Sequence, residues 1–299
     1  MYEAQFAAAF GNSAADTLRA QIRAWLAEDI GSGDITSWAT IPAGTRSMAV
    51  IHVKEDGILA GVPIARLVFE VVDPALEFRP LAADGDAVTK GTILAEVEGS
   101  THSILTGERL ALNLMQRLSG IATKTRAFVQ AIEGLPTRLV DTRKTTPGHR
   151  LLEKYAVRVG GGFNHRFGLY DAVMIKDNHI KGSGGITGAV QAARHAIPHT
   201  MKIEVETESL AQVEEALACG SDIIMLDNMS NDLMREAVAR IKASSPHVIV
   251  EASGGVNLTT IRSIAETGVD VISVGGLTYS FQSLDISLDL NGKKGGPAA

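Results

Sequence analysis

The chain has 299 residues, of which 45% are hydrophobic and 21% charged, close to the average of folded globular proteins. These proportions exclude a disordered, collagen-like or coiled-coil chain, and no apolar run approaches the roughly 18 residues of a membrane helix, so we expect no membrane partner. The formal net charge is −6, and the single cysteine, Cys219, excludes an internal disulfide and favours a reducing, cytoplasmic location.

The first part of the chain predicts a small mixed domain. Residues 1–11 include an acid and no Lys or Arg, which argues against a signal peptide. Apolar residues at helical spacing predict a helix over 18–30, residues 48–99 read as β-structure, and a long helical pattern follows over 103–133. We therefore expect an N-terminal α/β sandwich domain over residues 1–125.

From residue 137 the pattern changes to a repeated strand, loop and helix. Fully apolar strands that alternate with helices indicate a parallel sheet covered on both faces. Six or seven such units favour a closed barrel over an open sheet, so we expect a barrel domain over 126–290. Part of 280–290 is expected to return to the first domain as a helix, and the Gly/Lys-rich residues 291–299 are expected to form a flexible tail. The expected strands are 138–140, 172–175, 202–205, 222–226, 247–251 and 270–274.

The charge of the chain is unevenly distributed. Residues 141–181 hold eight Lys and Arg against four acids, a net charge of +4, which leaves −10 for the rest. A basic segment within an acidic protein indicates a local anionic ligand, whereas nucleic acid usually requires a broader basic face, so we expect no nucleic-acid partner. The alternative is a solvated charged surface.

Two glycine turns follow consecutive strands near the end of the chain. Glycine lets backbone N–H groups approach an anion closely, and α/β barrels often bind phosphate after their last two strands. Two ordinary strand–helix turns would look similar, but their consecutive positions favour a phosphate site. The turns comprise Ser253, Gly254 and Gly255, and Val274, Gly275 and Gly276.

Acidic residues stand at two further strand ends. Glu204 and Glu206 share one face of their strand, and Asp227 ends the next strand. Carboxylates beside a phosphate site suit Mg²⁺, which prefers few protein ligands and several substrate oxygens, and they could equally hold ribose hydroxyls. The alternatives are helix N-caps or partners of buried Lys and Arg.

Four cations stand in loops that follow strands of the same domain: Arg143, Lys144, Arg166 and Lys176. Arginine forks match the geometry of carboxylate and phosphate groups. Such a concentration of positive charge on one rim requires a multiply charged anion, because pairing with the nearby acids explains only some of the four.

These motifs together resemble the quinolinate phosphoribosyltransferase family, also named nicotinate-nucleotide pyrophosphorylases. The resemblance extends over about residues 15–290, with the motifs in the family's order. The matching segments are ERLALN at 108–113, DTRKTTPG at 141–148, GGFNHR at 161–166, IKDNH at 175–179, EVE at 204–206, LDN at 226–228, SGG at 253–255 and SVGG at 273–276.

The resemblance implies an N-terminal α/β sandwich and an open or irregular, TIM-like α/β barrel. It implies that quinolinate and phosphoribosyl pyrophosphate are converted to nicotinate mononucleotide, pyrophosphate and CO₂ with Mg²⁺, in de novo NAD biosynthesis. It also implies a homodimer or higher homo-oligomer with shared active sites.

Matching positions imply the site residues. Arg143, His165, Arg166 and Lys176 should bind the two quinolinate carboxylates, joined by Arg109 from a neighbouring subunit. Thr142 and Lys144 should contact substrate, with Lys144 on the pyrophosphate or a carboxylate. Glu206 and Asp227 should meet the ribose hydroxyls and the metal, and Ser253–Gly255 with Val274–Gly276 should hold the 5′-phosphate. Lys144, Lys176, Glu206 and Asp227 are the expected catalytic residues.

Two alternatives stay open at this point. A related barrel protein encoded with molybdenum transport systems shares the fold and some motifs, although the complete TRKT and NHR segments argue against it. A non-catalytic sensor of a phosphate ligand would also need the glycine turns and the cations.

Overall fold

A computed structural model describes residues 12–290, so the expectations for residues 1–11 and 291–299 lie outside the described part. The described residues form two compact units, one made of residues 12–123 with 282–290 and the other of Lys124–Phe281. None of the described helices combines the length and the apolar character that a membrane span needs.

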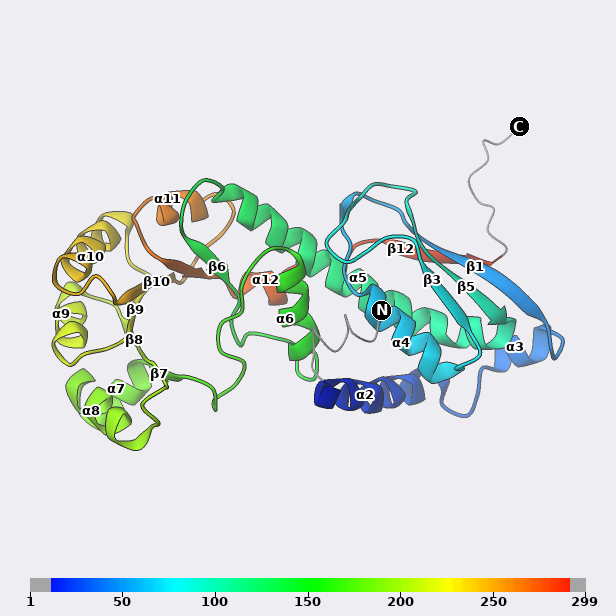
Figure 1. The fold of residues 1–299 in the computed structure, drawn as a ribbon, viewed down its shortest axis with the longest axis horizontal. Helices are drawn as coiled ribbons and strands as arrows, with labels where there is room; N and C mark the ends of the chain where they lie inside the picture. Colours follow the sequence, from blue (N-terminus) through cyan, green and yellow to red (C-terminus); the bar gives the residue numbers. More distant parts are fainter. Residues whose placement is uncertain (1–11, 291–299) are drawn as a thin grey trace. The chain divides into compact units, whose positions relative to one another are not determined.

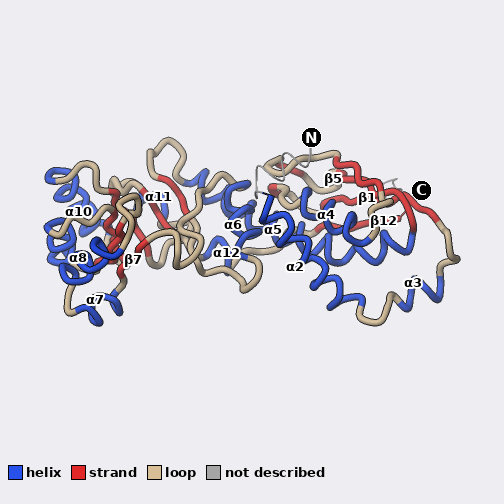
Figure 2. Tube along the Cα trace, turned by 60° about the horizontal axis from the view of Figure 1, so that its bottom comes forward, coloured by secondary structure: helices blue, strands red, loops and turns tan. Residues whose placement is uncertain are grey.

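The first unit is built on a four-stranded antiparallel sheet with the order β12-β1-β5-β3. Figures 1 and 2 show helices α2, α4 and α5 along one side of this sheet. The predicted α/β sandwich is thus confirmed, but the segment that returns from the end of the chain forms strand β12 beside β1, so the helix expected within 280–290 is wrong. The elements are α2 (Asn12–Ile30), α3 (Ile35–Thr40), β1 (Arg46–Val53), β2 (Gly57–Ile58), α4 (Val62–Val72), β3 (Glu77–Pro80), β4 (Ala87–Val88), β5 (Ile93–Ser100), α5 (Thr101–Ala131, which continues into the second unit) and β12 (Ile286–Leu290).

The expectation of continuous β-structure over 48–99 is wrong, because α4 lies within it. Its sequence is rich in β-branched residues, so a short apolar run of this kind does not distinguish strand from helix. The buried positions of α4, among them Ile64, Leu67 and Val68, recur at helical spacing. Pro63 in its first turn suits a helix start, since the missing N–H has no helical partner there.

The second unit contains six parallel strands in the order β6-β11-β10-β9-β8-β7. In Figure 1 helices α8, α9, α10 and α11 lie outside the curved sheet. The strands are β6 (Arg138–Val140), β7 (Val173–Ile175), β8 (Ile203–Thr207), β9 (Ile223–Asp227), β10 (Ile249–Ser253) and β11 (Val271–Ser273). The helices are α6 (Arg150–Val159), α7 (Asp177–Ser183), α8 (Ile186–Ala196), α9 (Leu210–Ala218), α10 (Asn231–Ser244), α11 (Ile261–Ala265) and α12 (Gly276–Tyr279).

The sheet does not close, because β6 and β7 are its two outermost strands. The closed barrel that we expected from the number of strand–helix units is therefore wrong. The open, TIM-like barrel implied by the family resemblance is confirmed. Between β6 and β7 the chain forms α6 and a long loop, which adds a single parallel bridge from Phe163 to Val140 in place of a full strand. The carboxyl ends of the parallel strands converge on one rim, where such folds place their ligands.

Candidate active site

A cavity of about 570 Å³ lies at the carboxyl ends of the strands of the second unit. Each expected site residue except Arg109 lines it, although these residues come from seven separate segments. They are Thr142, Arg143, Lys144, His165, Arg166, Lys176, Glu206, Asp227, Ser253, Gly254, Gly255, Val274, Gly275 and Gly276.

The loop after β6 carries Arg143 and Lys144 in a fixed conformation. The Thr142 hydroxyl accepts a hydrogen bond from the Lys144 N–H at 3.0 Å, and the Thr278 hydroxyl donates to the Lys144 carbonyl at 2.8 Å. Within residues 12–290, neither the Arg143 nor the Lys144 side chain makes a hydrogen bond or an ion pair. Both cations are therefore available to an anionic ligand.

Arg166 lies close to Arg143, and a backbone carbonyl fixes its side chain. Its guanidinium donates to the Ala172 carbonyl at 2.9 Å. Burial and the positive charge of Arg143 lower the pKa of Arg166. Two guanidinium groups that repel each other in a half-buried cavity favour a ligand with at least two negative charges, such as a dicarboxylate.

The opposite side of the cavity carries carboxylates. Lys176, which immediately precedes α7, forms an ion pair with Glu206 of β8. Burial and the neighbouring charge of Glu206 raise the pKa of Asp227. Two carboxylates that disfavour each other's charge suit a cation, so these residues fit Mg²⁺. Asp227 is no helix cap, because Ser230 caps α10 by accepting from the Leu233 N–H.

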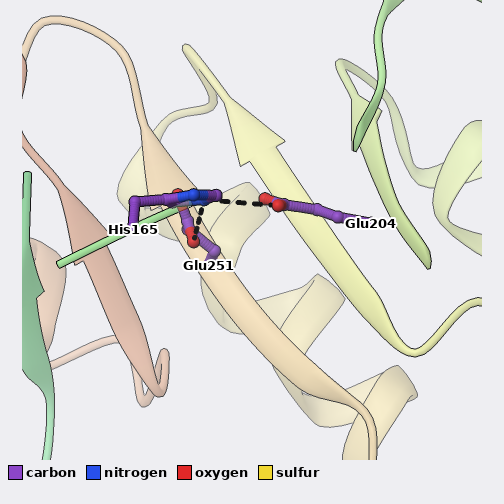
Figure 3. Close-up of side chains that lie close together, drawn as sticks. All are labelled: His165, Glu204 and Glu251. Carbon is purple, nitrogen blue, oxygen red and sulfur yellow. Dashed lines mark ion pairs between the residues drawn. The ribbon is translucent and has the colours of Figure 1, made fainter. Parts of the chain in front are cut away.

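His165 faces two buried glutamates, of which Glu251 also lines the cavity (Figure 3). Its Nε2 lies 3.3 Å from Glu204 and 3.4 Å from Glu251, which come from β8 and β10. Burial opposes the imidazolium form, but hydrogen bonds to the two glutamates raise the pKa of His165 to about 10. The Arg166 N–H lies 2.7 Å from Nδ1 and can donate to it only when the ring is neutral. His165 therefore faces the two glutamates through Nε2 and the Arg166 backbone through Nδ1.

The two glycine turns differ in their local geometry. Gly254 and Gly255 both have left-handed backbone angles, φ +89° and +63°, which residues with a side chain rarely adopt. At Gly275 a Cβ would come within 2.8 Å of the Lys144 side chain and 2.9 Å of the Tyr279 ring. Glycine there lets Lys144 pass across the turn toward the cavity.

Arg109 lies on α5 in the first unit, and 58% of its side chain is exposed. Its nearest acid is Glu108, at 3.9 Å. The cavity of the second unit does not include Arg109.

The sequence did not single out several other residues of the cavity lining. Strand alternation would have found three of them, because each stands two positions before an expected site residue and so shares its face. These are Met174 before Lys176, Met225 before Asp227 and Glu251 before Ser253. Asn228 directly follows β9 and Tyr279 ends α12, and neither carries such a signal.

Comparison with known proteins decides the family. The model of the quinolinate phosphoribosyl transferase C-terminal domain matches residues 121–289, and that of the N-terminal domain matches residues 34–119. The chain belongs to the quinolinate phosphoribosyltransferase family. The two matched models meet within α5, close to the boundary between the two units.

Individual relatives of the family match nearly the whole chain. A probable nicotinate-nucleotide pyrophosphorylase [carboxylating] of Synechocystis is 52% identical over 90% of this chain and 91% of its own. The corresponding Bacillus subtilis protein is 48% identical, over 88% of this chain and 90% of its own. The solved nicotinate-nucleotide pyrophosphorylase of Francisella tularensis superposes with a TM-score of 0.87 at 40% identity, covering 92% of this chain and 96% of that one.

Proposed function

We propose that this protein is a decarboxylating quinolinate phosphoribosyltransferase. It transfers the phosphoribosyl group of phosphoribosyl pyrophosphate to the ring nitrogen of quinolinate and forms nicotinate mononucleotide, pyrophosphate and CO₂ for NAD biosynthesis in the cytoplasm. The observation that carries the proposal is the convergence of Arg143, Lys144, Arg166 and Lys176 with two glycine turns and two carboxylates in one cavity, in a chain of this family.

The chain's own residues supply positioning and charge. Arg143 and Arg166 bind the two substrate carboxylates and orient the ring nitrogen toward the anomeric carbon. Lys144 and Lys176 stabilise the negative charge that develops on the departing pyrophosphate. The bond between the anomeric carbon and pyrophosphate breaks as the bond to nitrogen forms, so no covalent protein nucleophile is needed.

Decarboxylation then follows from the product of that step. The ring nitrogen is now cationic, and the C2–carboxylate bond breaks with its electron pair left at C2, beside the positive charge. A proton from water completes the C2–H bond. The protein's part is to keep the ring oriented and to limit the access of water.

Glu206 and Asp227 are the residues that would hold Mg²⁺, together with oxygens of phosphoribosyl pyrophosphate. Burial, together with the neighbouring charge of Glu206, raises the pKa of Asp227, and a pair of carboxylates in this situation favours a bound cation. Bound Mg²⁺ neutralises part of the pyrophosphate charge. Lys176 pairs with Glu206 and is therefore placed to exchange that partner for substrate.

We also propose a homodimer or higher homo-oligomer in which Arg109 completes the site of a neighbouring subunit. The Arg109 side chain is exposed, and within residues 12–290 it pairs with Glu108 alone, which supports a role outside its own unit.

Incubation with quinolinate, phosphoribosyl pyrophosphate and Mg²⁺ tests the activity, with release of CO₂ and nicotinate mononucleotide as the readout. A non-catalytic sensor would bind ligand and release no CO₂. Nicotinate should be used at least about a hundredfold less well, because it lacks the 2-carboxylate and leaves buried positive charge unpaired. Comparable turnover of nicotinate would contradict the proposed dicarboxylate site.

A further inference from the structure

Asn228 occupies an unusual position directly after β9. It is the one non-glycine residue with a positive φ, +53°, within the described residues 12–290. Residues with a Cβ rarely adopt the left-handed region, although asparagine tolerates it better than most. Such an outlier at the rim of a cavity indicates that the surrounding contacts require this conformation.

The contacts of Asn228 reach two sides of the cavity. Its amide Nδ2 donates to the Asp227 carboxylate over 2.7 Å, and its backbone N–H donates to the Ser253 carbonyl over 3.0 Å. A Cβ placed on Gly254 would overlap the Asn228 side-chain amide. The amide therefore lies directly against the turn that follows β10, while it holds the carboxylate that ends β9.

We infer that Asn228 is a positioning residue that couples the Asp227 carboxylate to the Ser253–Gly255 turn. The left-handed backbone directs the amide toward Asp227 and Gly254, and the hydrogen bond fixes one carboxylate oxygen. The Asp227 carboxylate makes no other hydrogen bond within the described residues, so its second oxygen stays available. This inference rests on the proposed function, in which Asp227 serves the ribose and metal end of phosphoribosyl pyrophosphate and the turn holds its 5′-phosphate.

Positioning of this kind predicts an effect on one substrate only. Phosphoribosyl pyrophosphate must contact both the carboxylate and the turn, so a loss of their alignment should weaken its binding. Quinolinate is assigned to Arg143 and Arg166, which Asn228 does not contact. A general structural role would instead weaken the binding of both substrates and lower the unfolding temperature of the protein.

Asn228→Gly is the decisive variant, because glycine accepts the left-handed backbone and removes only the amide. Titration calorimetry with phosphoribosyl pyrophosphate and Mg²⁺, without quinolinate, measures the affinity apart from turnover. We expect the affinity to fall about tenfold, the usual effect of losing a hydrogen bond to a charged group. Quinolinate affinity and the unfolding temperature should stay close to those of the wild type.

Two further variants sharpen the result. Asn228→Asp keeps the shape of the side chain but replaces the donor with a negative charge, so it should bind phosphoribosyl pyrophosphate more weakly than Asn228→Gly. Asn231→Gly is the matched control, since Asn231 begins α10, lies outside the cavity lining and makes no side-chain hydrogen bond within residues 12–290. The control should bind both substrates as the wild type does.

Unchanged phosphoribosyl pyrophosphate affinity in Asn228→Gly overturns the inference and leaves the proposed function intact. An equal loss of affinity for both substrates, together with a lowered unfolding temperature, also overturns the inference and indicates a role in folding. If the wild type itself fails to bind phosphoribosyl pyrophosphate, the proposed function is wrong and the inference fails with it.

Discussion

Asp141 and Lys154 form an ion pair in which both side chains are completely buried. The pair also holds the backbone of His165, because Asp141 accepts from its N–H at 2.9 Å and Lys154 donates to its carbonyl at 3.0 Å. Asn164 adds a third donor to Asp141, at 2.6 Å. The pair lies outside the cavity lining, so it acts on the site by fixing the segment that carries Arg166.

Lys154→Met should lower the free energy of unfolding by about 3–5 kcal/mol, because it leaves the Asp141 carboxylate buried and uncompensated. Burial already raises the pKa of Asp141, and the Lys154 charge opposes that rise. The double variant Asp141→Leu/Lys154→Met should recover most of the loss, since a buried ion pair can often be replaced by apolar residues. Urea unfolding measures both effects.

The double variant should nevertheless bind quinolinate about tenfold more weakly, because the His165 backbone loses two anchors. Lys181→Met is the control, since Lys181 forms an exposed pair with Asp177 and its loss should cost below about 1 kcal/mol. A double variant with wild-type affinity for quinolinate would show that the pair serves stability alone.

The stability of the protein should fall as the pH rises toward 10. His165 has a pKa of about 10 in the folded protein, against about 6.5 in an unfolded chain. A raised pKa contributes stability that is fully present below about pH 6.5 and is lost as the pH rises through about 10. Urea unfolding at several pH values in this range should show the decline.

Glu251→Gln should reduce this decline, because it removes one of the two carboxylates that favour the protonated imidazole. His195→Gln, at an exposed position of α8, should leave the wild-type pH profile unchanged. An identical profile in Glu251→Gln and the wild type would refute the assignment to this cluster.

Asp227→Ala should weaken phosphoribosyl pyrophosphate binding by at least about tenfold, or about 1.4 kcal/mol. Quinolinate binding should survive, since the cations assigned to it remain. Titration calorimetry with each ligand separates the two. Asp232→Ala, which removes an exposed carboxylate paired with Arg235, is the control. An equal loss of affinity for both ligands would indicate a structural role for Asp227.

Arg109→Ala and Lys176→Ala should each be nearly inactive alone and should recover activity when they are mixed and allowed to exchange subunits. If the site is shared in a dimer, random pairing makes half of the dimers mixed, and each mixed dimer has one intact site. Recovery should therefore approach about one quarter of the wild-type activity. If exchange is demonstrated and activity stays at the parental level, Arg109 acts within its own chain.

Local patterns were enough to identify the features that depend on neighbouring residues. The apolar strands between helices predicted the parallel sheet, and cations and glycines just after those strands predicted one ligand rim, since parallel strands end at the same edge. Strand alternation placed Glu204 and Glu206 on one face. The order of these motifs along the chain was by itself enough to indicate the family.

Contacts between distant segments required the tertiary structure. The sequence did not predict helix α4, because its short apolar run fits both the two-residue period of a strand and the 3.6-residue period of a helix. Only packing decides between the two. The open edge between β6 and β7 depends on how residues 141–172 fold, which no count of units reveals. The enclosure of His165 by Glu204 and Glu251 depends on the register and burial of two separate strands. The sequence alone determined which chemical groups the rim carries, and the fold decided which of them face a ligand and which pair with one another.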